Sequence, residues 1–175
     1  MNDVMIDLET LDILPTAAIV SIGAVLFSPA AGVLGKEFYT KVDMRSCVAV
    51  GMTLDPSTIS WWMGQSDAAR AVFAGDDRKR ITDALADFVA WLPDGARLWS
   101  HGASFDLPIL EHAMRKVGFL PKWSFRDHRD TRTAYAMAKV DPKKFYDGTA
   151  HNALDDAKTQ ALHAIKVLQH LKGGK

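Results

Sequence analysis

Two carboxylates near the start of the chain raise the question of what chemistry this sequence performs. Asp7 and Glu9 lie in the apolar segment VMIDLETLD, which spans Val4 to Asp12. In a β-strand, residues i and i+2 point to the same face, so the two side chains would lie side by side. Two like charges share a buried position only when something compensates them, and a metal ion is the usual compensator. The alternative is a surface strand with one polar face.

Two further segments carry polar groups of the same kind. SHGASFDLPIL places Asp106 where a short apolar strand meets a helix, and HNALDDAKTQAL places His151 five residues before Asp156. Taken singly, each has an ordinary explanation: a helix cap, a loop histidine, and acidic residues that complement a helix dipole. Taken together, four carboxylates can converge above one sheet, where they would offer the oxygen ligands that Mg²⁺ or Mn²⁺ prefers.

Such a cluster indicates metal-dependent cleavage of phosphodiester bonds. A pair of divalent ions about 4 Å apart supports in-line hydrolysis, because one ion activates the attacking water and the other stabilises the leaving oxygen. His151 beside the ions would take the proton of the water, since histidine side chains titrate near neutrality. We therefore expect two ions, Mg²⁺ or Mn²⁺, held by Asp7, Glu9, Asp106 and Asp156.

The composition limits the class of protein. The chain has 175 residues, 48% of them apolar, and a formal net charge of zero, which predicts one globular domain over residues 1–175. Proteins that hold duplex DNA by phosphate neutralisation are usually basic, so any nucleic-acid contact here must be local or metal-mediated. Cys47 is the only cysteine, which excludes an internal disulfide and suits a reducing compartment. With no signal or membrane-spanning pattern, we expect a cytoplasmic protein without a membrane partner.

Strand-like and helical patterns alternate along the chain in an order that can position these residues. Strand-like runs at 3–9, 17–27 and 33–42 come first, and SPAAG between the second and third is typical of a hairpin. The last helix presents an apolar face from Leu154 to Leu171. Helices are expected at 55–66, 77–92, 105–118, 129–138 and 153–171, with a strand at 96–102 and a loop at 139–152. This order predicts a mixed sheet with helices packed on it.

The helix at 55–66 carries two tryptophans with different expected positions. Asp55 is its expected cap. Ile59, Trp62 and Met63 share one face, which predicts a core contact. Trp61 points elsewhere, where it could stack on a base.

The motifs resemble those of a known superfamily. IDLET, HGASFDLPIL and HNALDDA are similar, in order and spacing, to the three exonuclease motifs of the DEDD (DnaQ-like) 3′–5′ exonucleases, in the histidine-containing DEDDh branch. The resemblance spans residues 7–157. TISWWMGQSDAAR and RDTRT also resemble a smaller group of phage and bacterial exonucleases in that branch. The resemblance implies a ribonuclease-H-like fold, with a five-stranded mixed sheet flanked by helices.

The resemblance also implies a role for each residue of the cluster. Asp7 would bridge both ions, and Glu9 would bind the ion that activates water. Asp106 would hold the second ion, and Asp156 would be the last ligand. His151 would be the general base.

Residues beside the cluster are expected to contact the end of the substrate. Thr10 and Leu11 would lie against the terminal nucleotide, with Leu11 wedged beside the last base. Phe105 would pack on the terminal sugar, and Trp61 would stack on a base. Core positions are the alternative for Leu11 and Phe105.

Four other residues near the motifs have open roles. Many relatives have Asn in place of His101, which could still position Asp106. Asp130 and Arg132 of RDTRT could serve the site, a helix start or an interface. Asp155 is one residue out of register with the metal ligands and is expected to face solvent.

The expected function is metal-dependent hydrolysis of single-stranded nucleic acid from a free 3′ end, with DNA favoured, releasing 5′-nucleoside monophosphates. An exoribonuclease acting on single-stranded RNA or 3′ overhangs is the alternative, because the choice turns on contacts to the 2′-hydroxyl. A catalytically inactive nucleic-acid-binding module is a second alternative, which the complete set of carboxylates argues against. Members of the resembled group often pair, so a homodimer is expected.

Overall fold

The computed structural model describes residues 1–139 and 151–173. Its strands form one mixed five-stranded sheet in the order β3-β2-β1-β4-β5, which confirms the predicted architecture. β1 pairs antiparallel with β2 and parallel with β4, β2 pairs antiparallel with β3, and β4 pairs parallel with β5. The strands are β1 (Asp3–Thr10), β2 (Ile19–Ser28), β3 (Val33–Lys41), β4 (Arg97–Ser100) and β5 (His128–Asp130).

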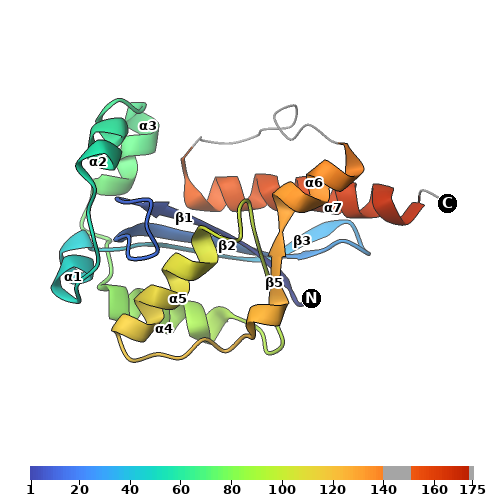
Figure 1. Cartoon of the computed structure of the whole chain (residues 1–175), viewed down its shortest axis with the longest axis horizontal. Coiled ribbons are helices and arrows are strands. Elements are labelled where there is room, and N and C mark those ends of the chain that lie inside the picture. Colours follow the sequence, from blue (N-terminus) through green and yellow to red (C-terminus); the bar gives the residue numbers. More distant parts are fainter. Residues whose placement is uncertain (140–150, 174–175) are drawn as a thin grey trace.

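Helices flank the sheet on both faces. α6 and α7 lie over one face, α4 and α5 lie under the other, and α1, α2 and α3 gather at one end of the sheet (Figure 1). The helices are α1 (Met44–Ala49), α2 (Pro56–Met63), α3 (Asp67–Arg70), α4 (Ile81–Trp91), α5 (Asp106–Lys116), α6 (Thr131–Ala138) and α7 (Ala153–Gly173). In the described part of the chain, none of them has both the length and the apolar character of a membrane-spanning segment.

The alternation of side chains along β1 decides where the carboxylates point. Ile6 and Leu8 are buried in the core that includes residues of α4 and α5. Met5 is buried in the second core, which includes residues of α7. Asp7 and Glu9 share the parity of Met5, so they lie on the α7 face, as the period of two predicts. That face is covered, because Glu9 is only 8% exposed, and β1 is therefore no surface strand.

The structure differs from the predicted elements at two places: α4 starts later than predicted, and α1 was not predicted. α4 begins at Ile81 rather than at Asp77, because Lys79 stays extended and forms a parallel bridge with Val42. α1 lies in a stretch for which no helix was predicted. It has only six residues and one buried side chain, Cys47, which is too short for a periodic pattern.

The core face predicted for α2 is confirmed at Trp62 but wrong at Ile59 and Met63, and the apolar face predicted for α7 is wrong at its last residue, Leu171. Asp55 caps α2 as predicted, and Trp62 is buried, but Ile59 is 37% exposed and Met63 is 70% exposed. α2 lies at the end of the sheet (Figure 1), so one side chain suffices to anchor it. Leu171 is 39% exposed, since the last turn of α7 runs past the sheet. The predicted loop at 139–152 falls mostly outside the described residues.

Candidate active site

Strand β1, which carries Asp7 and Glu9, meets the start of α5, which carries Asp106, near the carboxyl end of the strand. Asp106 is the first residue of α5, and its Oδ1 accepts a hydrogen bond from the backbone N–H of Leu8 at 3.0 Å. The cap position of α5 is Phe105, which makes no side-chain capping bond, so Asp106 is not the helix cap. This bond ties the start of α5 to β1 and brings a third carboxylate to Asp7 and Glu9.

Helix α7 reaches the same place because a glycine lets it approach the sheet. Gly23 of β2 pairs with Asp7, and a Cβ added there would lie 2.1 Å from the carbonyl carbon of Ala153. Without that side chain, the first turn of α7 packs directly on the sheet and carries Asp156 toward β1. One turn later, Nε2 of Gln160 donates a hydrogen bond to Oδ1 of Asp7 at 2.8 Å.

His151 lies at the entrance to α7 with an unusual backbone. Its φ angle is +63°, and its backbone N–H donates to Oδ2 of Asp156 at 3.1 Å. Potential ligand atoms of Glu9, His151 and Asp156 all lie within 4.8 Å of one another. The structure therefore brings the predicted general base and two predicted metal ligands together.

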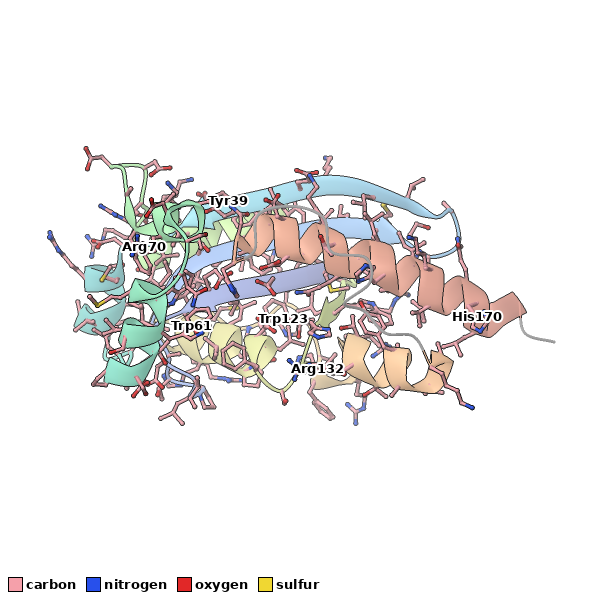
Figure 2. All side chains as sticks on the ribbon, turned by 90° about the horizontal axis from the view of Figure 1, so that it is seen from above. Tyr39, Trp61, Arg70, Trp123, Arg132 and His170 are labelled. Atoms are coloured by element: carbon pink, nitrogen blue, oxygen red, sulfur yellow. The ribbon has the colours of Figure 1, made fainter. Side chains whose placement is uncertain are left out.

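The two tryptophans of α2 brace this corner of the site. The ring centroid of Trp61 lies 4.8 Å from that of His151, with the planes at 81°, and the ring of Trp62 lies 6.2 Å away. Nε1 of Trp62 donates to the backbone carbonyl of Thr10 at 2.9 Å. In Figure 2, Trp61 lies beside α2, close to the carboxyl end of β1. Trp61 thus contacts the imidazole, and its predicted contact with a base stays a prediction.

A cleft of about 410 Å³ opens beside the carboxylates. Its lining includes Glu9 and three of the predicted substrate contacts, namely Thr10, Trp61 and Phe105. Leu11 is 4% exposed and belongs to the core, as the alternative expectation had it. Ile13, which is 71% exposed, lines the cleft instead.

The turn that presents Ile13 is held by a buried carboxylate. Oδ1 of Asp12 accepts from the backbone N–H groups of Ile13 at 2.6 Å and Leu14 at 3.2 Å. Its Oδ2 accepts from the hydroxyl of Thr53 at 2.6 Å. The local sequence pattern does not indicate Ile13, because nothing in it shows which residue of the turn faces outward.

Burial and mutual repulsion perturb the carboxylates strongly. Burial, followed by the charges of Asp106, Glu9 and Asp156, raises the pKa of Asp7 well above its usual range. Burial and the nearby charges of Asp156 and Asp106 raise the pKa of Glu9 to about 8. Burial raises the pKa of Asp106 to about 7, although the N–H of Leu8 and the charge of Arg132 oppose this rise.

This arrangement fits divalent cations. Buried carboxylates whose charges repel one another are stabilised by a positive charge, and their oxygens suit Mg²⁺ or Mn²⁺. The residues that would hold such ions are Asp7, Glu9, Asp106 and Asp156.

The RDTRT segment borders the site from the other side. Asp130 accepts from the backbone N–H groups of Thr133 at 2.8 Å and Ala103 at 2.7 Å, so it caps α6 and fixes the turn before Asp106. Gly102 has φ +111°, and an added Cβ would lie 3.4 Å from the guanidinium of Arg132. Arg132 is exposed at the start of α6 (Figure 2).

His101 and Asp155, whose roles the sequence did not decide, form hydrogen bonds with residues other than Asp106. Nδ1 of His101 lies 2.9 Å from the hydroxyl of Thr131, whose Oγ1 bonds the carbonyl of Ser100. His101 thus braces β4 against α6. Asp155 is half-buried, and its backbone N–H donates to Oδ1 of Asn152, which caps the first turn of α7.

A mixed five-stranded sheet that carries acidic residues on β1, α5 and α7, with a histidine before α7, is the arrangement of a ribonuclease-H-like nuclease. Together with the family match given next, it places the chain in the DEDDh, DnaQ-like superfamily. Enzymes of this class are 3′–5′ exonucleases that depend on divalent metal ions. The chain belongs to the family described as the 3′–5′ exoribonuclease Rv2179c-like domain, which matches residues 2–168. It is therefore a 3′–5′ exonuclease.

Individual relatives agree with this assignment. The chain is 29% identical, over an alignment of 209 positions, to the exodeoxyribonuclease of Enterobacteria phage T4, which covers 99% of this chain and 92% of the phage protein. The nuclease domain of 3′hExo, a DEDDh family member bound to rAMP, has the same fold, with a TM-score of 0.67 and 19% identity over 95% of this chain and 91% of that domain. E. coli exonuclease I in complex with a dA16 oligonucleotide has a TM-score of 0.65 at 13% identity, over 97% of this chain and 42% of that one.

Proposed function

We propose that the chain removes nucleotides one at a time from the free 3′ end of single-stranded nucleic acid, using two Mg²⁺ or Mn²⁺ ions and a histidine base. The observation that carries the proposal is the convergence of four carboxylates and His151 at the edge of one cleft. The products are 5′-nucleoside monophosphates. When bound, the ions supply Lewis-acid activation of the phosphodiester and of the attacking water.

The protein groups divide the remaining work. The imidazole of His151, placed near Glu9 and Asp156, accepts the proton of the attacking water. Trp61 packs at right angles to that ring and restricts its orientation. Thr10 and Phe105 line the cleft that would receive the terminal nucleotide, and exposed Ile13 replaces buried Leu11 as the apolar contact for its base.

Arg132 supplies the phosphate contact in this proposal. Its guanidinium lies beside Gly102, close enough to Asp106 for its charge to lower the pKa of that carboxyl. Arginine pairs well with phosphate because its planar fork of donors matches the phosphate oxygens. A single local cation also suits a chain whose net charge is zero, since the enzyme needs to hold only the end of a strand.

DNA is the favoured substrate, and single-stranded RNA or 3′ overhangs are the second candidate. The similarity to a phage exodeoxyribonuclease over nearly the full length supports DNA. The description of the matching family as an exoribonuclease domain supports RNA. Discrimination would come from contacts to the 2′-hydroxyl in the cleft.

Matched, end-labelled DNA and RNA strands of one sequence test this proposal. With Mn²⁺, strands with a free 3′-hydroxyl should be shortened stepwise from that end, DNA faster than RNA. Strands with a 3′-phosphate and circular single strands should survive, because the cleft must accept a 3′-hydroxyl. Cutting of the circle, or full activity in excess chelator, would contradict the proposal. Homodimerisation, a single domain over residues 1–175 and a cytoplasmic location stay predictions.

A further inference from the structure

We infer that Gln160 is a positioning residue that orients Asp7 for the metal ions and couples its carboxylate to helix α7. The inference rests on the proposed metal site and assigns a task to a residue outside the superfamily motifs. Gln160 follows Asp156 by four residues, so both side chains lie on one face of α7. One helix therefore carries one metal ligand and holds a second ligand that belongs to β1.

The bond between Gln160 and Asp7 is short and partly buried. Nε2 of Gln160 lies 2.8 Å from Oδ1 of Asp7, on the α7 face of the sheet. The phenol of Tyr135 donates to the backbone carbonyl of Gln160 at 3.2 Å, which links this turn of α7 to α6. A carboxylate fixed through one oxygen keeps its second oxygen available to a cation.

The amide is chemically suited to this task. A lysine or arginine in its place would neutralise Asp7 and compete with a metal ion, whereas a neutral amide orients the carboxylate and leaves its negative charge for the ion. Partners of this kind commonly hold metal ligands in their binding orientation.

The other end of the amide argues against a role in stability alone. Oε1 of Gln160 is buried and has no hydrogen-bond partner among the described residues. A buried acceptor without a partner destabilises the folded state. An apolar side chain of similar length would avoid that loss, so the amide is explained by what its donor does to Asp7.

The test compares two substitutions of the same type on the same helix. Gln160→Met removes the donor to Asp7. Gln169→Met removes a donor to the carbonyl of Pro29, far from the site, and serves as the matched control. Mn²⁺ affinity is measured by titration calorimetry, exonuclease rate is measured against Mn²⁺ concentration, and melting is followed in chelator.

Gln160→Met should weaken Mn²⁺ binding by about 10–100-fold and raise the Mn²⁺ concentration for half-maximal rate by the same factor. The rate at saturating Mn²⁺ should stay close to wild type, and the chelated variant should melt at the wild-type temperature or above it. Gln169→Met should change neither binding nor rate. An unchanged Mn²⁺ affinity in folded Gln160→Met would overturn the inference.

Two further variants keep the result interpretable. Gln160→Lys places an ammonium against Asp7, so it should raise the melting temperature in chelator and weaken Mn²⁺ binding more than Gln160→Met does. Wild-type Mn²⁺ binding in this variant would also overturn the inference.

Asp7→Asn separates this inference from the proposed function. If Asp7→Asn abolishes Mn²⁺ binding and activity while Gln160→Met binds normally, the inference fails and the proposed function stands. If Asp7→Asn retains the wild-type rate, the proposed function itself fails.

Discussion

In the metal-free protein, the free energy of unfolding should fall as pH rises, because the carboxylates of the site become charged. Glu9→Gln should remove much of this loss of stability. An ordinary glutamate has a pKa of 4.5, whereas the pKa of Glu9 in the folded protein is raised to about 8. Between these values the folded state holds a proton that the unfolded state has released. The free energy of unfolding therefore falls with rising pH in this window, and the loss is complete above pH 8.

The magnitude follows from the same two values. One pKa unit corresponds to about 1.4 kcal/mol, and neighbouring carboxylates share part of the effect, so Glu9 accounts for a loss on the order of 3–5 kcal/mol by pH 8.5. For a chain of this size, that corresponds to a decrease in melting temperature of roughly 10 °C. Glu9→Gln keeps the shape of the side chain and carries no charge at any pH.

Urea denaturation in chelator, at steps from pH 4.5 to pH 8.5, measures this effect for both proteins. The difference between variant and wild type is the informative quantity, because titration of His101, whose pKa is lowered by burial, cancels in it. That difference should be small at pH 4.5 and should favour Glu9→Gln increasingly up to pH 8.5. Saturating Mn²⁺ should restore the wild-type protein at high pH. A difference that stays constant with pH would refute the reasoning about repulsion in the site.

Two other substitutions test the proposed roles of the site residues. His151→Asn keeps a residue type that tolerates φ +63° and should lower the rate by about 10²–10⁴-fold while sparing Mn²⁺ affinity. Weakened Mn²⁺ binding with an unchanged pH–rate profile would mean that His151 only braces the loop. Arg132→Gln should weaken binding of single strands and reduce the slope of the logarithm of the binding constant against the logarithm of salt concentration by about 0.7. Arg126 is an exposed arginine that lies over the ring of Phe125, and Arg126→Gln should leave both unchanged. If this slope is unchanged in Arg132→Gln, Arg132 does not contact the phosphates.

Local patterns in the sequence predicted a large part of the fold and the types of residue in the site. The alternation along β1 predicted that Asp7 and Glu9 share a face, and they do. Asp55 predicted the start of α2, because capping depends on residues three positions apart. Resemblance to the three motifs predicted which further residues belong to the site, and the structure brings Asp106 and His151 to it.

Contacts between residues far apart in the chain were decided only by the tertiary structure. The donor to Asp7 comes from Gln160, and the glycine that admits α7 is Gly23, which depends on the register of β1 against β2. The contact of Trp61 with His151 joins segments ninety residues apart. Periodicity and capping act over a few residues, so they fix which face of an element is apolar. They do not fix which residue of another element meets it, because that depends on how the layers pack.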